Sequence, residues 1–444
     1  MRRLQMKRQE FKGEITVFLS LIFMLIISLV GSLLMSASIQ TTRSMKRADT
    51  HLALESVFAE YHKELWENYG LFAKEGTNEK EISRRLMFYG AKKMEHKIKR
   101  IQLLSDGDGE VFYRQAVKAM GGDILDIWEV SDEAVEEEEK ANALEIQSVL
   151  EEEEKELPEE DNPIVSVSQL KKSSLLSLVL PDSREISGQT VQLEQLPSHR
   201  SLQQGTDNVE EIQNANPINK TIFVTYLIKY FPSFAENVED QFLHYEAEYL
   251  LAGKGSDQEN LETVAKKLLS IRMAANYAYL LTDQEKLFEA ETVATALATT
   301  MKCPAIAGLL KQAILFAWAY GESIMDLRIL YNDGCVPLVK TDAHWQLQLE
   351  KLVKLGTSEE IQGKDEGEEG LSYENYLEAL LLLEDRKTLS MRALDLIELH
   401  LEVPVDTCVT AMEIETTLNL EMGVQDKFST EFFYIIGICA NREK

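Results

Sequence analysis

Cysteine and positive charge are both scarce in this chain. Four cysteines among 444 residues are too few for a small disulfide-dense scaffold. Lys and Arg number 46 against 75 Asp and Glu, so the net charge is -29. This charge repels a nucleic-acid backbone and argues against nucleic acid as a partner. The hydrophobic share of 45% still supplies apolar material for roughly two or three domains.

Catalytic signatures are missing as well. Residues 252–256 (AGKGS) resemble a phosphate-binding loop, but that motif requires a glycine where Glu248 stands and Ser or Thr where Gly255 stands. We expect a tight turn there. The seven histidines include no pair spaced as in zinc hydrolases, and no nucleophile elbow or dinucleotide glycine pattern occurs. The sequence therefore predicts a protein that is not an enzyme and holds no cofactor.

Clustered acids do not indicate a metal site either. Residues 106–110 (DGDGE) resemble the start of a calcium loop, but Val111 stands at the sharp-turn glycine and Val117 at the bidentate acid. We expect a plain loop. Closely spaced acids such as Glu246 and Glu248 are common in so acidic a chain, and we expect them at the surface. No metal is predicted.

One long apolar run stands out near the N-terminus. Residues 15–42 carry no charge, and residues 15–35 (ITVFLSLIFMLIISLVGSLLM) provide the ~20 apolar residues that cross a bilayer as a helix. The small residues Ser28, Gly31 and Ser32 leave room for another helix to approach, although small residues in such a run are more often incidental. The next most apolar stretch, 305–320, contains Lys311 and is expected to be a buried helix. The chain is thus predicted to be a single-pass membrane protein.

Flanking charges predict its orientation. More basic residues precede the apolar run than follow it: Arg2, Arg3, Lys7, Arg8 and Lys12 against Arg43, Lys46 and Arg47. This bias favours a cytoplasmic N-terminus and an extracytoplasmic C-terminal domain at the cell membrane. The alternative is a secretory signal cut near Ile39, although the apolar run exceeds the ~7 to 15 residues typical of a signal core.

The junction at residues 11–19 (FKGEITVFL) resembles the leader of type IV pilin-like proteins, in which a short basic leader and a glycine precede a hydrophobic helix. A prepilin peptidase cuts that class after the glycine. The resemblance implies processing between Gly13 and Glu14, with a prepilin peptidase as a partner. The commonest pattern has glutamate as the fifth mature residue, where this chain has Phe18.

A wider likeness covers residues 13–23, 52–72 and 248–281. These stretches resemble an uncharacterised family of single-pass proteins that accompanies tight-adherence (Flp-type) pilus and secretion components in Gram-positive bacteria. The resemblance implies the membrane and pilus or secretion subunits as partners. That family has no established biochemical activity to carry over.

A helical spine is expected beyond the membrane. Apolar residues recur there every three or four positions: Leu54, Phe58, Tyr61, Leu65 and Tyr69. An unbroken helix over 15–69 would be about 80 Å long, as in pilin-like subunits. A break near Thr41 and Thr42, or a helix that packs on its own soluble domain, fits the pattern equally.

We predict an α+β fold with five regions. They are a basic leader (1–14), a transmembrane helix with an amphipathic extension (15–75), a helical region with an acidic run (76–157), a disordered linker (158–216) and an extracytoplasmic α+β domain (217–444). The acidic run, 129–161, holds sixteen Asp and Glu against two Lys. Like charges at this density favour an extended, solvated segment, and an acidic arm that collects calcium or binds a partner is the alternative.

Within the distal domain, local patterns predict mainly helices. Asp257 is the expected N-cap of a helix to about residue 281, and further helices are expected at 284–299, 305–331, 373–383 and 386–401. Residues 242–250 are expected to form a strand. Residues 407–420 and 431–439 are rich in β-branched and aromatic residues, and we expect them to pair as an antiparallel hairpin.

All four cysteines, Cys303, Cys335, Cys408 and Cys439, fall in the distal domain. Four cysteines allow three pairings, and free thiols remain an alternative. We take Cys303 with Cys335 as the preferred disulfide, because the two flank one helical segment.

These patterns lead to one functional expectation and one alternative. The first is a structural or accessory pilin-like membrane protein of a tight-adherence-type pilus or secretion apparatus. The alternative is a membrane-anchored extracytoplasmic module that binds or senses a ligand.

Overall fold

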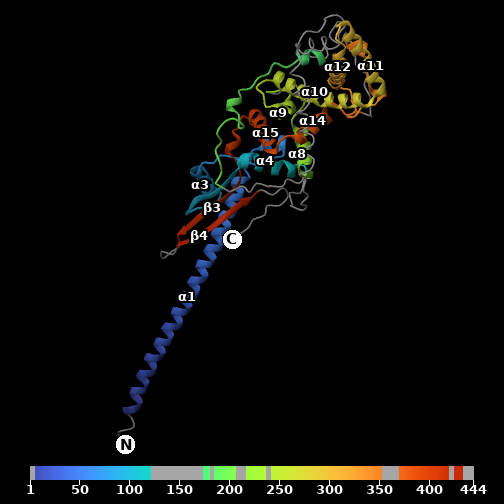
Figure 1. Cartoon of the computed structure of the whole chain (residues 1–444). Helices are drawn as coiled ribbons and strands as arrows, with labels where there is room; N and C mark the ends of the chain where they lie inside the picture. Colours follow the sequence, from blue (N-terminus) through green and yellow to red (C-terminus); the bar gives the residue numbers. More distant parts are fainter. Residues whose placement is uncertain are drawn as a thin grey trace.

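The computed structural model describes residues 6–121, 174–180, 185–206, 217–236, 242–352, 370–419 and 425–433. It confirms the predicted α+β class: a long apolar N-terminal helix leads into a mostly helical body that carries a small antiparallel sheet. Figure 1 shows the helix projecting as a stalk from an elongated body. The acidic run at 129–161 lies outside the described residues.

The stalk is α1, Met6–Phe58, a single helix of 53 residues. At ~1.5 Å per residue it is about 80 Å long. It passes unbroken through Thr41 and Thr42, whose hydroxyls donate to the carbonyls of Ala37 and Ser38 one turn earlier. The helical path instead breaks after Phe58, and α2 (Lys63–Tyr69) begins a new direction. Gly70 ends α2 in the left-handed conformation, with φ of 66°.

A four-stranded antiparallel sheet packs on the end of the stalk. Its strands are β1 (Lys74–Glu75), β2 (Met94–Leu103), β3 (Cys408–Asn419) and β4 (Gln425–Phe433). Strand β3 is central, with β2 on one side and β4 and β1 on the other. The C-terminal hairpin is confirmed, although β4 begins at Gln425, six residues before the expected second strand.

The prediction of a helical region at 76–157 is only partly right in its described part, up to residue 121. Helices α3 (Glu79–Phe88) and α4 (Asp106–Ala119) do form, but β2 lies between them. The β2 sequence MEHKIKRIQL also alternates with the period of a strand, and β3 supplies the hydrogen-bonding edge that selects this conformation. Ile98 lies opposite Ile414, a pairing that joins the two ends of the chain.

The helical body consists of longer helices and short connecting ones. They are α7 (Leu175–Val179), α8 (Pro217–Tyr230), α9 (Glu246–Ala252), α10 (Asp257–Thr282), α11 (Gln284–Thr300), α12 (Ala307–Leu330), α13 (Leu349–Leu352), α14 (Tyr373–Leu383) and α15 (Arg386–Leu401), with 3-10 turns at Leu193–Gln195, Pro304–Ile306, Asp342–His344 and Val405–Thr407. Helices α11, α12, α14 and α15 match their predicted bounds within two residues. The expected strand at 242–250 is wrong, since α9 occupies most of that stretch. Ser256, rather than Asp257, caps α10.

Two apolar cores hold these parts together. A smaller one joins the end of α1, α3 and the sheet through residues such as Leu54, Leu86 and Ile414. The larger one fills the helical body around residues such as Phe223, Leu268 and Trp318. The sheet core therefore combines residues from both ends of the chain.

This arrangement corrects two boundaries. The distal region 217–444 does not form a unit by itself, because β3 and β4 complete the sheet of residues 74–103. Part of the expected disordered linker is packed: Leu176 and Val179 of α7 and Leu196 are each at most 3% exposed. The aliphatic residues scattered through that stretch were the sequence signal for this packing, since Leu176, Val179 and Leu196 all belong to the larger core.

Candidate functional site

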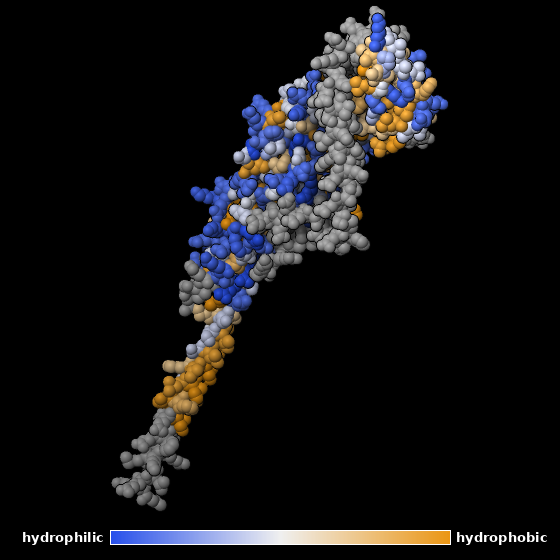
Figure 2. Space-filling view, viewed as in Figure 1, coloured by the Kyte–Doolittle hydropathy of each residue, from blue (hydrophilic) through white to orange (hydrophobic). Residues whose placement is uncertain are grey.

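The candidate functional element is the first half of α1. From Ile15 onward its apolar side chains lie almost entirely in the open, and Leu25 and Phe23 are 70% and 65% exposed. Figure 2 shows this surface as a continuous hydrophobic band on the stalk. Within the described residues, Ile15–Phe58 is the one helix long and apolar enough to cross a membrane, and its most apolar window is 0% buried. Burial of such a surface requires a lipid environment or other helices.

The same helix contains the residues predicted to matter for processing and packing. Gly13 and Glu14 both lie inside α1, before the exposed apolar band. A Cβ added at Gly31 would meet nothing within 4 Å, so the helix surface there is open. The Ser32 hydroxyl donates to the carbonyl of Leu29 in the same helix, and only this small side chain lies on the helix surface there. Small side chains at this surface would allow another helix to pack closely against α1.

Strand β4 holds the second half of the stalk. Arg43 Nε lies 3.3 Å from Asp426 Oδ2, and Arg47 lies 5.3 Å above the ring of Phe428. Further along, the rings of Phe58 and Phe432 stack at 4.0 Å between centroids. These contacts fix the direction of the stalk relative to the body.

A buried polar chain lies where α2 meets the helical body. The Tyr69 hydroxyl is hydrogen-bonded to His400 Nδ1, and His400 Nε2 lies 2.7 Å from Glu246 Oε1. Glu246 is fully buried, and this burial raises the pKa of its carboxyl while His400 opposes the rise. Tyr69 is only 5% exposed and the His400 side chain 15%. The polar chain ties α2 to α9 and α15.

Two other buried carboxylates bind backbone and hydroxyl donors. Glu248 accepts hydrogen bonds from the Tyr373 hydroxyl at 2.6 Å and the Phe234 amide at 3.0 Å. Asp395 accepts from the Ser198 amide at 2.8 Å and the Tyr249 hydroxyl at 2.7 Å. Burial raises the pKa of Glu248 to about 7 and that of Asp395 to about 6.

The expected surface position of Glu246 and Glu248 is thus wrong, because both side chains are 0% exposed. The two acids stand on α9, which is covered by α10, α14 and α15. Most of their hydrogen-bond and ion-pair partners lie more than 100 residues away in the sequence. No local sequence pattern therefore indicates that these two acids are buried. The one available signal was their place in the apolar stretch LHYEAEYLL.

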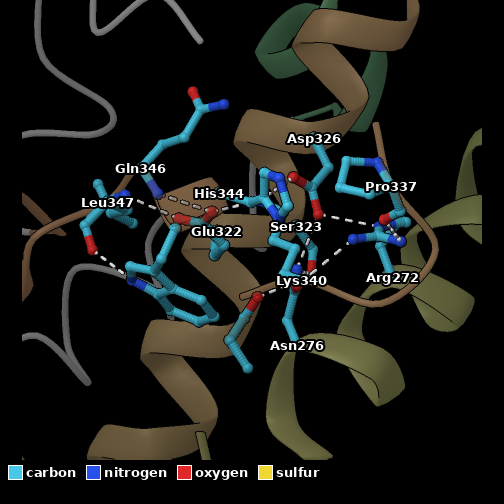
Figure 3. A network of polar contacts seen from close by, with 12 residues as sticks. Arg272, Asn276, Glu322, Ser323, Asp326, Pro337, Lys340, His344, Gln346 and Leu347 are labelled. Carbon is cyan, nitrogen blue, oxygen red and sulfur yellow. Dashed lines mark hydrogen bonds and ion pairs between the residues drawn. The ribbon is translucent and has the colours of Figure 1, made fainter. Parts of the chain in front are cut away.

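A network of buried charges holds a loop to α10 and α12 (Figure 3). Arg272 Nε lies 2.9 Å from Asp326 Oδ2, and Lys340 Nζ contacts Glu322 and lies 2.5 Å from Asp326 Oδ1. Arg272 also donates to the carbonyl of Pro337 at 2.9 Å. Two acids and two bases balance, and all four are at most 4% exposed. A satisfied, enclosed network of this kind is structural.

Glu322 extends the network to the following segment. Its carboxylate accepts from the amides of Gln346 at 3.0 Å and Leu347 at 2.8 Å. The Leu347 carbonyl in turn accepts from the Trp318 and Trp345 indoles, each at 2.7 Å. The loop after α12 is therefore held at several points, from Pro337 to Leu347.

The two near-motifs have structural roles. Residues 252–256 form the turn from α9 to α10, as expected. The expected loop at 106–110 is the start of α4, where Gly107, Asp108 and Gly109 all have positive φ. Asp106 binds the amides of Leu103 and Gly205 at 2.7 and 2.8 Å. Across the described ranges, no cluster of three or more His, Cys, Asp or Glu is placed to hold a metal ion.

The preferred disulfide does not fit this fold. Cys303 lies at the N-terminal end of α12, where its carbonyl accepts from Ile306, and Cys335 follows Gly334, whose amide bonds to Ile329 at the other end. A helix of 24 residues is about 36 Å long. A disulfide requires Cα atoms within about 7 Å. The two cysteines flank one helix in the sequence, and their thiols therefore lie near opposite ends of that helix in the structure.

By its fold this is an α+β protein. Among the described elements, one N-terminal helix is long and apolar enough to span a membrane. The chain belongs to the Family of unknown function (DUF5702), whose model matches residues 153–420, more than half of the chain. Comparisons with curated proteins and with solved structures return no match.

Proposed function

We propose that this chain is a structural or accessory, pilin-like membrane protein of a tight-adherence-type pilus or secretion apparatus. The observation that carries the proposal is α1: it is exposed and apolar over its first half and packed on an antiparallel sheet over its second. Such a helix offers one surface to the membrane or to neighbouring subunits and keeps the body at a fixed direction. The leader resemblance at Gly13 and Glu14 supports the same reading.

In this proposal the N-terminus is cytoplasmic and the body is extracytoplasmic. The uncharged run, 15–42, is 28 residues long, about 42 Å as a helix, which matches the ~40 to 45 Å of a bilayer with its headgroups. Arg43 and the sheet would then begin at the outer surface. Ser28, Gly31 and Ser32 would be the contact points for a partner helix.

The deciding experiment is the mature N-terminus, determined by intact mass in a host with its own prepilin peptidase. A chain that starts at Glu14 and co-fractionates with pilus or secretion subunits supports the proposal. As a matched control, Gly13→Leu should leave the leader uncut while the body still folds. A chain that starts near Ile39 is a secreted protein and contradicts membrane anchoring.

The alternative function is a membrane-anchored extracytoplasmic binding or sensing module. A surface groove beside α3 favours it, as described below. An uncut leader together with fractionation away from pilus components would support this alternative over the first proposal.

A further inference from the structure

A groove of about 380 Å³ opens between α3 and the edge of β2. One side is the outer face of α3, and the other is His96 of β2. It is lined by Glu79, Lys80, Ser83, Arg84, Met87 and His96. The lining residues include neither the exposed apolar residues of α1 nor any member of the buried polar clusters, so neither of these explains the groove.

Positive charge collects around this groove in an otherwise acidic chain. Residues 79–100 contain eight Lys and Arg against three Glu, whereas the whole chain has a net charge of -29. Part of this charge is neutralised: Arg85 pairs with Glu60 and Glu81, and Lys99 and Arg100 pair with Glu413. The residues left over around α3 form what we call the α3–β2 basic surface: Lys80, Arg84, Lys92 and Lys93, all exposed. Lys97 is exposed as well, but it lies on the other face of β2, opposite Glu415 of β3.

Three lysines of this surface, Lys80, Lys92 and Lys93, make no ion pair with any other residue in the parts of the chain that the structure describes. Arg84 has a 3.7 Å contact with Glu81, but its side chain is 78% exposed. An exposed pair of this kind contributes little and leaves the guanidinium accessible.

Apolar side chains stand among these charges. Phe88 is 77% exposed and Met87 is 42% exposed, both at the end of α3 just before the Lys92–Lys93 turn. A partner that covers them must supply apolar groups as well as negative charge. A polypeptide does so, whereas a phosphate polymer supplies charge alone.

The place of this surface on the stalk argues against lipid headgroups, on the membrane position proposed above. Thr50 contacts Met94 at the start of β2, and Glu60 contacts Arg85 of α3. Along α1, Thr50 lies about 12 Å from Thr42, the last residue of the uncharged run, and Phe58, the end of the helix just before Glu60, lies about 24 Å from it. Screening at physiological salt reduces charge attraction beyond about 8 Å.

We propose that the α3–β2 basic surface binds an acidic polypeptide segment. Its carboxylates would meet the lysines, and its aliphatic side chains would cover Met87 and Phe88. The chain contains one sequence of this composition, residues 129–161, in which runs of glutamate alternate with Leu, Ile and Val. This sequence provides a defined probe.

The test is zero-length carbodiimide cross-linking of the full chain, in nonionic detergent without lipid, to an isotope-labelled peptide of residues 129–161. Mass spectrometry should find amide links at Lys80, Lys92 or Lys93, either from the labelled peptide or from the same acids of the chain itself. Changing all three lysines to Glu should lower the peptide yield about tenfold. The matched control changes Lys254, Lys266 and Lys302, exposed lysines of the helical body, and should leave the yield unchanged.

Two results would overturn the proposal. One is cross-linking spread evenly over the control lysines. The other is evidence that charge alone holds the peptide. We expect Phe88→Ser to weaken peptide binding about fivefold, because an apolar contact is lost. If Phe88→Ser has no effect while inorganic polyphosphate displaces the peptide, the surface binds polyanions rather than acidic polypeptides. Because no bilayer is present, neither result depends on where the mature chain begins.

Discussion

Glu248 makes the stability of this protein depend on pH in a way that one substitution isolates. The side chain is 0% exposed, and only Oε1 has hydrogen-bond donors, the Tyr373 hydroxyl and the Phe234 amide. Its second oxygen, Oε2, is buried with no hydrogen-bond partner among the described residues. Burial disfavours the charged form and raises the pKa from 4.5 to about 7.

The sign follows from proton binding. Between pH 4.5 and 7 the folded state binds this proton more tightly than the unfolded state does, so the free energy of unfolding falls as pH rises through that window. Below pH 4.5 both states are protonated and the full stability is present. Each pH unit of difference in pKa corresponds to about 1.4 kcal/mol, so the loss on reaching pH 8 is about 3 kcal/mol.

Glu248→Gln keeps the shape and removes the titration. We expect urea unfolding of the full chain in nonionic detergent to show a pH-dependent difference between variant and wild type. Relative to its value at pH 4, this difference should move about 3 kcal/mol in favour of the variant by pH 8. Any constant cost of the amide cancels in that comparison. The exposed Glu194→Gln is the control and should give a flat difference. A flat difference for Glu248→Gln would refute the reasoning.

Three further outcomes are expected. Lys340→Met should lower the free energy of unfolding by about 3 to 5 kcal/mol, since it leaves buried carboxylates without their cation; a loss under 1 kcal/mol in urea unfolding would contradict this. Gly109→Ala should cost about 1 to 3 kcal/mol more than Gly121→Ala, because both have positive φ but only the first would place its Cβ 2.7 Å from a neighbouring side chain; equal costs in thermal unfolding would show that the clash relaxes. Leu25→Arg should shift the chain out of the carbonate-resistant membrane fraction, at a cost of about 3 kcal/mol in insertion, whereas Leu52→Arg, also exposed on α1 but beyond the apolar run, should not.

Several elements were predictable because their signals are local. The helices Tyr373–Leu383 and Arg386–Leu401 match their predicted bounds, and each has a side-chain N-cap, Ser372 or Asp385, directly before it. The C-terminal hairpin was predictable because its two strands are neighbours in sequence and alternate in the period of a strand.

Long-range partners account for the errors. The basic and apolar residues of β2 fit a helix or a strand, and the choice depended on β3, more than 300 residues later. Likewise, α9 was expected to be a strand because its apolar run has no caps that distinguish the two forms. The buried position of Glu246 depended on His400, which comes from α15.

The sequence by itself determined the stalk and the class of the fold. An uncharged run of 28 residues has one favourable conformation in an apolar environment, since only a helix satisfies its backbone internally. The tertiary structure alone decided where the stalk turns, which acids are buried, which thiols stay apart and how the lysines of α3 and of the turn before β2 come to share one surface. Burial and ion pairing depend on which segments meet in space, and in this chain the N-terminal and C-terminal segments meet in one sheet.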